Sequence, residues 1–103
     1  MKKNAIIVSG YFNPLHKGHI EYFKLAKKEG DYLFVIVNND IQRNLKGSKK
    51  FMLEEERKTI IKELRLVDKV YLSIDKDRSV SKTIRKIYNE NNKKFNMCFA
   101  NGG

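Results

Sequence analysis

The sequence is poor in cysteine and has no long apolar run among its 103 residues. The single Cys98 excludes a disulfide framework and a cysteine metal cluster, and its apolar neighbours predict a buried, inert thiol. No segment approaches the roughly 18 apolar residues that a membrane span needs. The first ten residues contain no signal-peptide cleavage site. These absences predict a soluble cytoplasmic protein.

Positive charge is what the sequence has in excess. It holds 22 Lys and Arg against 12 Asp and Glu, which gives a formal net charge of +10 at pH 7. Such a field attracts polyanions such as nucleotides, nucleic acids or anionic surfaces, and charge alone does not choose among them. The 41% hydrophobic share, with six Phe and five Tyr, is enough for one core, so residues 1–103 are predicted to form a single domain.

Strand-like and helix-like segments alternate along the chain. Short apolar runs predict strands at 5–8, 32–37, 69–74 and 95–100. Apolar residues at helical spacing predict helices at 18–29, 53–67 and 80–88, and the basic stretch 41–50 is predicted to be a loop. This order predicts an α/β, Rossmann-like three-layer sandwich: a parallel sheet with helices on both faces and ligand loops at the carboxyl ends of its strands.

The residues that suggest chemistry follow the first predicted strand, from Gly10 to His19. A glycine turn leads to His16 and His19, which lie on one side of a helix start. The free N–H groups and the dipole there favour a phosphate, and Gly18 has no side chain to block its approach. The two imidazoles, with Lys17 beside them, could stabilise charge that develops during nucleotidyl transfer. A purely structural role is the alternative, and a zinc site is disfavoured because no Cys or carboxylate lies nearby.

This segment resembles the HxGH signature of the nucleotidyltransferase superfamily, and especially its cytidylyltransferase-like branch, which includes the glycerol-3-phosphate cytidylyltransferases. The resemblance continues through the segments 30–33, 39–40, 56–58 and 65–70 and so covers essentially the whole chain. It implies transfer of CMP from CTP to a phosphorylated small molecule, with release of pyrophosphate. It also implies Mg²⁺ bound with the triphosphate, and a homodimer.

Residue roles are carried over from the family by position. The resemblance implies three catalytic residues, His16, His19 and Lys46. It implies nucleotide-binding roles for Gly10, Tyr11, Phe12, Asn13, Gly18, Asn101 and Gly102. It implies acceptor-binding roles for Asp40 and Arg65. The simpler alternatives are a solvated Lys46 and a turn residue at Asp40. Arg57 and Arg65 are harder to assign: Arg65 could reach a phosphate or a partner subunit, and a surface salt bridge to a neighbouring Glu is an equal alternative.

The sequence departs from the family pattern at two places. Asn13 stands where many cytidylyltransferases have Asp, and an amide ligates a cation less strongly than a carboxylate, so a metal role for Asn13 is doubtful. The family also continues beyond a segment like 101–103 to an Ile-Ser-Ser/Thr-Thr type motif that holds the triphosphate. That motif is absent, so we expect a C-terminally shortened domain, with weak turnover unless a partner completes the site.

Several alternatives stay open at this point. CTP is favoured by the branch resemblance, with ATP as the rival in an adenylyltransferase that uses a sugar phosphate. The acceptor could equally be glycerol phosphate or an amino-alcohol phosphate. A non-catalytic nucleotide-binding remnant is a further alternative. A small nucleic-acid-binding domain is disfavoured, because the aromatic residues occupy periodic core positions rather than an exposed basic stripe.

Overall fold

The structure, a computed structural model, describes residues 2–47 and 52–100. Its elements are β1 (Lys3–Gly10), α1 (Lys17–Lys27), β2 (Tyr32–Val37), α2 (Asp40–Lys46), α3 (Glu54–Lys62), β3 (Lys69–Leu72), α4 (Ser81–Asn91) and β4 (Phe95–Phe99). The strands form one parallel sheet in the order β3-β2-β1-β4. The predicted α/β fold with a parallel sheet is confirmed. Within the described ranges, no helix is long and apolar enough to cross a membrane.

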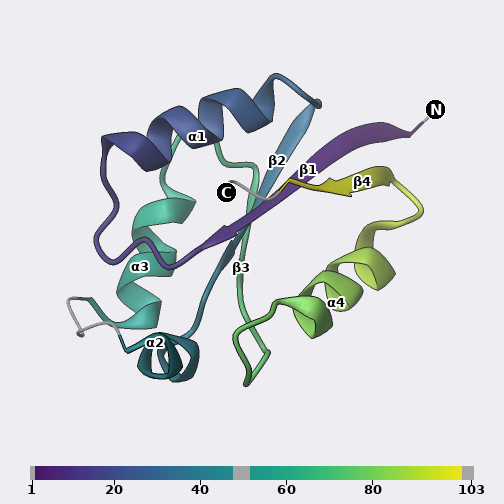
Figure 1. Ribbon diagram of the computed structural model, residues 1–103. Helices are drawn as coiled ribbons and strands as arrows, with labels where there is room; N and C mark the ends of the chain where they lie inside the picture. The colour runs from purple at the N-terminus through teal and green to yellow at the C-terminus, as the bar shows by residue number, and fades with distance from the viewer. Residues whose placement is uncertain (1, 48–51, 101–103) are drawn as a thin grey trace.

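The two central strands are buried on both faces, which is why they read as continuous apolar runs. Side chains alternate between the faces of a strand. Ile6 and Val8 of β1 therefore join the core cluster under α1 and α3, whereas Ala5 and Ile7 join the cluster with Ile87 of α4. Figure 1 shows α1 and α3 on one side of the sheet and α4 on the other. The predicted three-layer sandwich is therefore confirmed.

The segment 41–50 is not simply a loop, because Asp40–Lys46 forms helix α2. The Asn39 side chain accepts a hydrogen bond from the Gln42 N–H at 2.9 Å, and the Gln42 side chain accepts one from the Asn39 N–H at 3.0 Å. This capping box starts the helix, and Gly47, with φ of 81°, ends it. The basic composition suggested a loop, but the caps favour a helix.

Two further predictions were wrong in detail. The helix expected over 53–67 ends at Lys62, and Leu64 and Val67 pack against the core from the following turn. Cys98 is exposed rather than buried. It lies on the edge strand β4, and Met97 beside it packs into the cluster under α4. Because side chains alternate, Cys98 points to the opposite face.

Candidate active site

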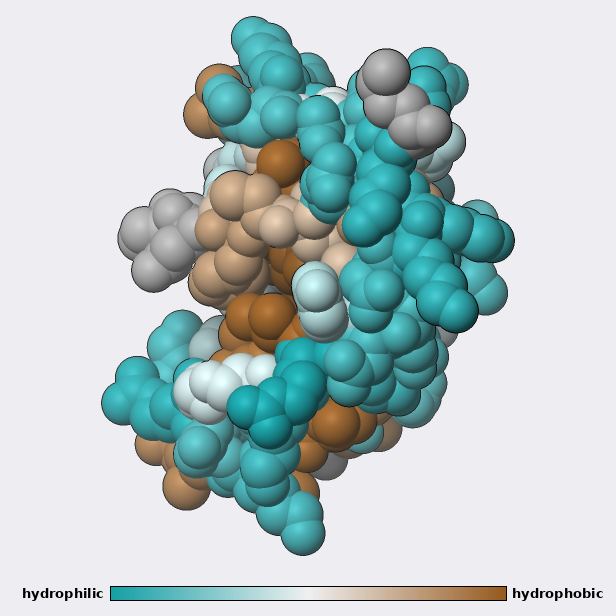
Figure 2. Space-filling view, turned by 90° about the vertical axis from the view of Figure 1, so that its right-hand side faces the viewer, coloured by the Kyte–Doolittle hydropathy of each residue, from teal (hydrophilic) through white to brown (hydrophobic). Residues whose placement is uncertain are grey.

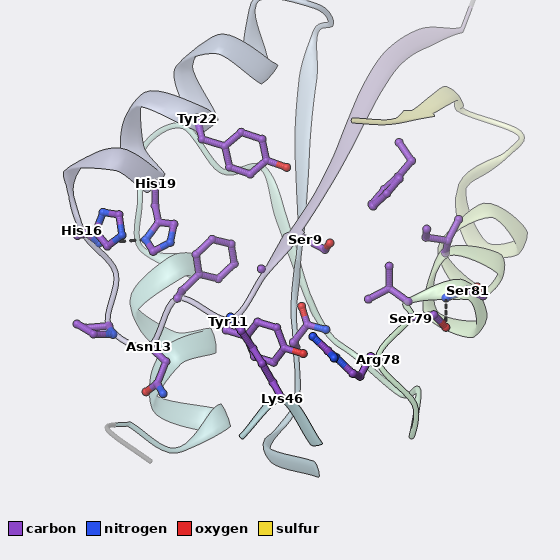
Figure 3. Close-up of a pocket in the computed structure, with 17 residues that line it drawn as sticks. Ser9, Tyr11, Asn13, His16, His19, Tyr22, Lys46, Arg78, Ser79 and Ser81 are labelled. Atoms are coloured by element: carbon purple, nitrogen blue, oxygen red, sulfur yellow. Dashed lines mark hydrogen bonds between the residues drawn. The ribbon is translucent and has the colours of Figure 1, made fainter. Parts of the chain in front are cut away.

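A cavity of about 840 Å³ opens at the carboxyl ends of β1 and β4. In an open parallel sheet, ligands bind where the connections from two neighbouring strands leave to opposite faces. Here the loop after β1 and the start of α1 form one wall, and the loop between β3 and α4 forms the other (Figure 3). The described lining residues include Lys46, Arg78 and both histidines, and none of them is Asp or Glu. The cavity is therefore suited to an anionic ligand.

His16 and His19 cap helix α1 through their own side chains. His16 Nδ1 accepts a hydrogen bond from the Gly18 N–H at 3.1 Å, and His19 Nδ1 accepts one from the His16 N–H at 3.1 Å. The rings stack with their centroids 3.9 Å apart. Because each Nδ1 is an acceptor, each neutral imidazole has its proton on Nε2. The pair thus offers two Nε2–H donors to a ligand.

His19 is held in its neutral form. Burial is the larger cause, and the charge of the neighbouring His16 the smaller one, of a pKa of His19 below its ordinary value of 6.5. Protonation would also place a hydrogen on Nδ1, which already faces the His16 N–H. His19 is therefore suited to donate a hydrogen bond near neutral pH rather than to supply a full positive charge.

Two glycines shape this wall of the cavity. A Cβ on Gly18 would lie 2.9 Å from His16 Cε1, so Gly18 makes room for the His16 ring. This role is additional to the one predicted from the sequence, which is to leave space for a phosphate. A Cβ on Gly10 would lie 2.7 Å from Cζ of Phe12. Phe12 is buried with φ of 51°, and its ring meets His19 edge to face at 4.9 Å. The tight turn thus places the buried Phe12 ring against His19.

Arg57 ties together the loops that carry the site. Its side chain is fully buried, and Nη1 donates to the carbonyl oxygens of Tyr11 and Asn38, each at 2.7 Å. Nε donates to the Met52 carbonyl at 3.1 Å, and Nη2 pairs with Asp40 at 2.7 Å. The surface salt bridge to a neighbouring Glu, considered from the sequence, is wrong for Arg57, because its side chain is buried and its ion pair is with Asp40. Its place among the apolar positions of the α3 pattern was the available signal for burial.

The structure gives Asp40 a structural role. Burial raises the pKa of Asp40, but hydrogen bonds from the Glu54 N–H and the side chains of Arg57 and Arg43, together with the Arg57 charge, outweigh burial and bring it below its ordinary value. Its carboxylate is committed to these partners and is not on the described cavity wall. The predicted acceptor contact gains no support from this placement.

Arg65 lies away from the cavity. It is exposed in the turn between α3 and β3, at the amino-terminal edge of the sheet, whereas the cavity opens at the carboxyl-terminal edge. The predicted contact between Arg65 and an acceptor gains no support from this placement.

The remaining predicted residues are mostly brought together. Gly10, Tyr11, Phe12 and Asn13 line the cavity with the histidines, and Lys46 reaches it from the end of α2, where Nζ lies 4.5 Å from the centre of the Tyr11 ring. Asn101 and Gly102 lie outside the described residues.

The sequence reasoning missed the wall formed by the β3–α4 loop and α4. This wall carries Arg78, Ser79 and Ser81 (Figure 3). The apolar side chains of Val80 and Ile84 line it as well, and Phe99 of β4 adds to the cavity lining. The signal was topological: in a parallel sheet the loop after the third strand emerges at the same edge as the loops after the first two. Figure 2 shows the α4 and β4 side of the molecule, where hydrophobic surface is exposed in a hollow among hydrophilic residues.

The described residues do not form a site for Mg²⁺. This ion prefers carboxylate, phosphate and water oxygens. The described cavity wall has no carboxylate, and residues 2–47 and 52–100 contain no cluster of three or more His, Cys, Asp or Glu that could hold a metal ion. Binding of Mg²⁺ together with a triphosphate remains a prediction.

Comparison with known proteins finds a matching family and similar curated proteins. Residues 7–102 match the family described as cytidylyltransferase-like. The chain is 37% identical over 82 residues to FAD synthase of Picrophilus torridus, a match that covers 80% of this chain and 58% of that protein. It is 39% identical over 88 residues to FAD synthase of Ferroglobus placidus, covering 84% and 54% respectively. The chain thus spans little more than half the length of these curated relatives.

A solved structure has the same fold. The lipopolysaccharide core biosynthesis protein of Thermoplasma volcanium superposes with a TM-score of 0.76 at 25% sequence identity. The match covers 96% of this chain and 95% of the other.

Proposed function

This chain belongs to the cytidylyltransferase-like family of the nucleotidyltransferase superfamily, and from that premise we propose that it transfers adenylate from ATP to FMN. The observation that carries nucleotidyl transfer is the stacked pair of His16 and His19. Their Nε2–H donors lie at a helix start, on a cavity whose described wall has cationic groups and no carboxylate. Such donors stabilise charge on phosphate oxygens.

The proposed reaction is an in-line displacement at phosphorus. An oxygen of the FMN phosphate attacks the α-phosphorus of ATP and forms a new P–O bond. The bond from the α-phosphorus to the oxygen bridging the β-phosphate breaks, and pyrophosphate leaves with the electron pair. A phosphate dianion needs no general base, so the protein mainly positions both reactants and donates hydrogen bonds. His16 and His19 would donate to the transferring and leaving phosphates, and Lys46 would hold the α-phosphate.

The choice of ATP over CTP rests on the relatives. FAD consists of FMN joined to adenylate, and the curated relatives that cover most of this chain are FAD synthases. These relatives favour ATP, whereas the branch resemblance alone favoured CTP. The apolar side chains of Val80, Ile84 and Phe99 add support, because they provide a wall on which a flat ring system can pack.

The test is product formation with a panel of substrates. The chain is incubated with Mg²⁺ and either ATP or CTP, and with FMN, glycerol 3-phosphate or a sugar phosphate. Pyrophosphate is measured, and the product is identified by mass spectrometry. We expect pyrophosphate and FAD with ATP and FMN together. A cytidylylated product would overturn the choice of nucleotide, and absence of pyrophosphate throughout, in a chain that still binds nucleotide, would support the non-catalytic alternative.

A further inference from the structure

The loop between β3 and α4 is fixed by two buried amide side chains of α2 and its cap. Asn39 and Gln42 each donate twice through their side-chain nitrogens, at 2.7 to 3.0 Å. The acceptors are the carbonyl oxygens of alternate residues, namely Ser73, Asp75, Asp77 and Ser79. The backbone is therefore held on both sides of Arg78.

The first part of the same loop is anchored to the start of α4. The Asp75 carboxylate is buried and accepts hydrogen bonds from the N–H groups of Lys82 at 2.8 Å and Thr83 at 2.9 Å. The Asp77 carboxylate accepts from the Ser79 N–H at 3.0 Å and from the Ser79 hydroxyl at 2.7 Å. A loop tied at this many points loses little entropy when a ligand binds to it.

Arg78 is the cation that this loop presents to the cavity. Its guanidinium forms no hydrogen bond or ion pair with any residue in the described part of the chain, whereas Arg43 and Arg57 both pair with Asp40. A guanidinium has five N–H donors and matches the geometry of a phosphate. Since no carboxylate lines the described wall, the partner that suits Arg78 is an anionic ligand.

We propose that Arg78 binds the phosphate of the acceptor, an assignment that rests on the proposed function. In an in-line displacement, the attacking and leaving oxygens lie on opposite sides of the α-phosphorus. The histidines line the α1 wall, and Arg78 lines the α4 wall (Figure 3). With pyrophosphate leaving on the histidine side, the attacking phosphate enters on the side of Arg78. Arg78 is thus a specificity-determining residue for phosphate monoesters, held in place by Gln42 and Asn39.

The test uses inorganic phosphate as the probe and needs no turnover. The Arg78 Nε–H signal and the backbone amide signals are followed by NMR during phosphate titration, with and without saturating ATP. The same titration is run on Arg78→Ala, on Arg78→Lys and on Arg85→Ala. Arg85→Ala is a matched control, because it removes the same charge from α4 at a position that does not line the described cavity wall.

We expect phosphate to shift the Arg78 signal saturably and to do so with ATP bound. Arg78→Ala should weaken phosphate binding by about tenfold, with a smaller loss in Arg78→Lys and none in Arg85→Ala. Absence of binding, equal affinity in Arg78→Ala, or displacement of phosphate by ATP at the Arg78 signal would each overturn the assignment. FAD formation with any of these results would leave the proposed function intact. Phosphate binding as expected without FAD formation would count against the proposed function and leave the phosphate site at Arg78 intact.

Discussion

Replacing Arg57 with Met should weaken both the fold and the site. Met fills a similar volume in the core but lacks the guanidinium that bonds to the loops after β1 and β2, to Met52 and to Asp40. The carbonyl oxygens of Tyr11 and Asn38 lose their 2.7 Å partner, and the Asp40 carboxylate loses its closest cation. The expected effect is therefore the cost of unsatisfied polar groups rather than of lost apolar packing.

The magnitude follows from the kind of contact that is lost. Removing one partner from a buried ion pair costs about 3 to 5 kcal/mol, and hydrogen bonds to charged groups contribute about 1.5 to 3 kcal/mol each. These terms share one side chain and do not add, so we expect a loss of about 3 to 5 kcal/mol for Arg57→Met. Typical domains have about 5 to 15 kcal/mol of stability. Arg57→Lys should also destabilise, because a single ammonium cannot reproduce the planar fork.

Urea unfolding of the wild type and the two variants measures this free energy. The wild-type advantage should shrink as the pH falls below the ordinary Asp40 pKa of 3.8. The folded-state pKa is lower than that value, so this contribution is present above the unfolded pKa and is lost as the pH falls through the folded one. A change below about 1 kcal/mol for Arg57→Met at pH 7 would refute the role of Arg57 in tying the loops together.

The other predictions concern the wall around the histidines. Gly10→Ala should destabilise the fold by about 1 to 3 kcal/mol in urea unfolding, because its Cβ must displace the buried Phe12 ring, and an unchanged unfolding midpoint would contradict this. Gly18→Ala should cost less stability but lower kcat, because its Cβ displaces the His16 ring, which is exposed; wild-type kcat would count against this geometry. In NMR titration His19 should titrate below pH 6.5. The free energy of unfolding should fall as the pH drops from about 6.5 through that lowered pKa, because the unfolded chain takes up the proton first. A His19 pKa at or above 6.5 would contradict the lowering of its pKa by burial and by His16.

The sequence was sufficient for the layers of the fold because the central strands are buried on both faces. A short continuous apolar run such as 32–37, separated from the next run by a helical segment, is typical of a strand buried in a parallel sheet. Helix α2 was missed because its caps, Asn39 and Gly47, had to be weighed against a basic composition. Cys98 was misplaced because the sequence of one strand does not tell whether that strand lies at the edge of the sheet.

For the site, local motifs predicted one wall and topology decided the other. The segment from Gly10 to His19 is contiguous, so its residues could be grouped without a fold. Arg78 enters the cavity only because β3 ends at the same edge of the sheet as β1 and β2. Arg57 was considered for a surface salt bridge because a guanidinium is buried only where several acceptors surround it. Its carbonyl partners come largely from loops distant in the sequence, so the sequence alone did not reveal them.

The central claim is that the imidazoles of His16 and His19 act on phosphate, beyond capping α1. Helix α2 offers a control, because its capping box uses Asn39 and Gln42 at the equivalent positions. The double variant His16→Asn, His19→Gln copies that box and preserves a helix start while removing both rings.

The decisive measurement is the single-turnover rate of pyrophosphate release from ATP and FMN by this double variant and by the wild type. Urea unfolding of both proteins serves as the control for folding. We predict a fall in rate of at least about 100-fold with little change in the unfolding midpoint. A rate close to that of the wild type in the folded variant would contradict the claim and leave the two histidines as helix caps alone.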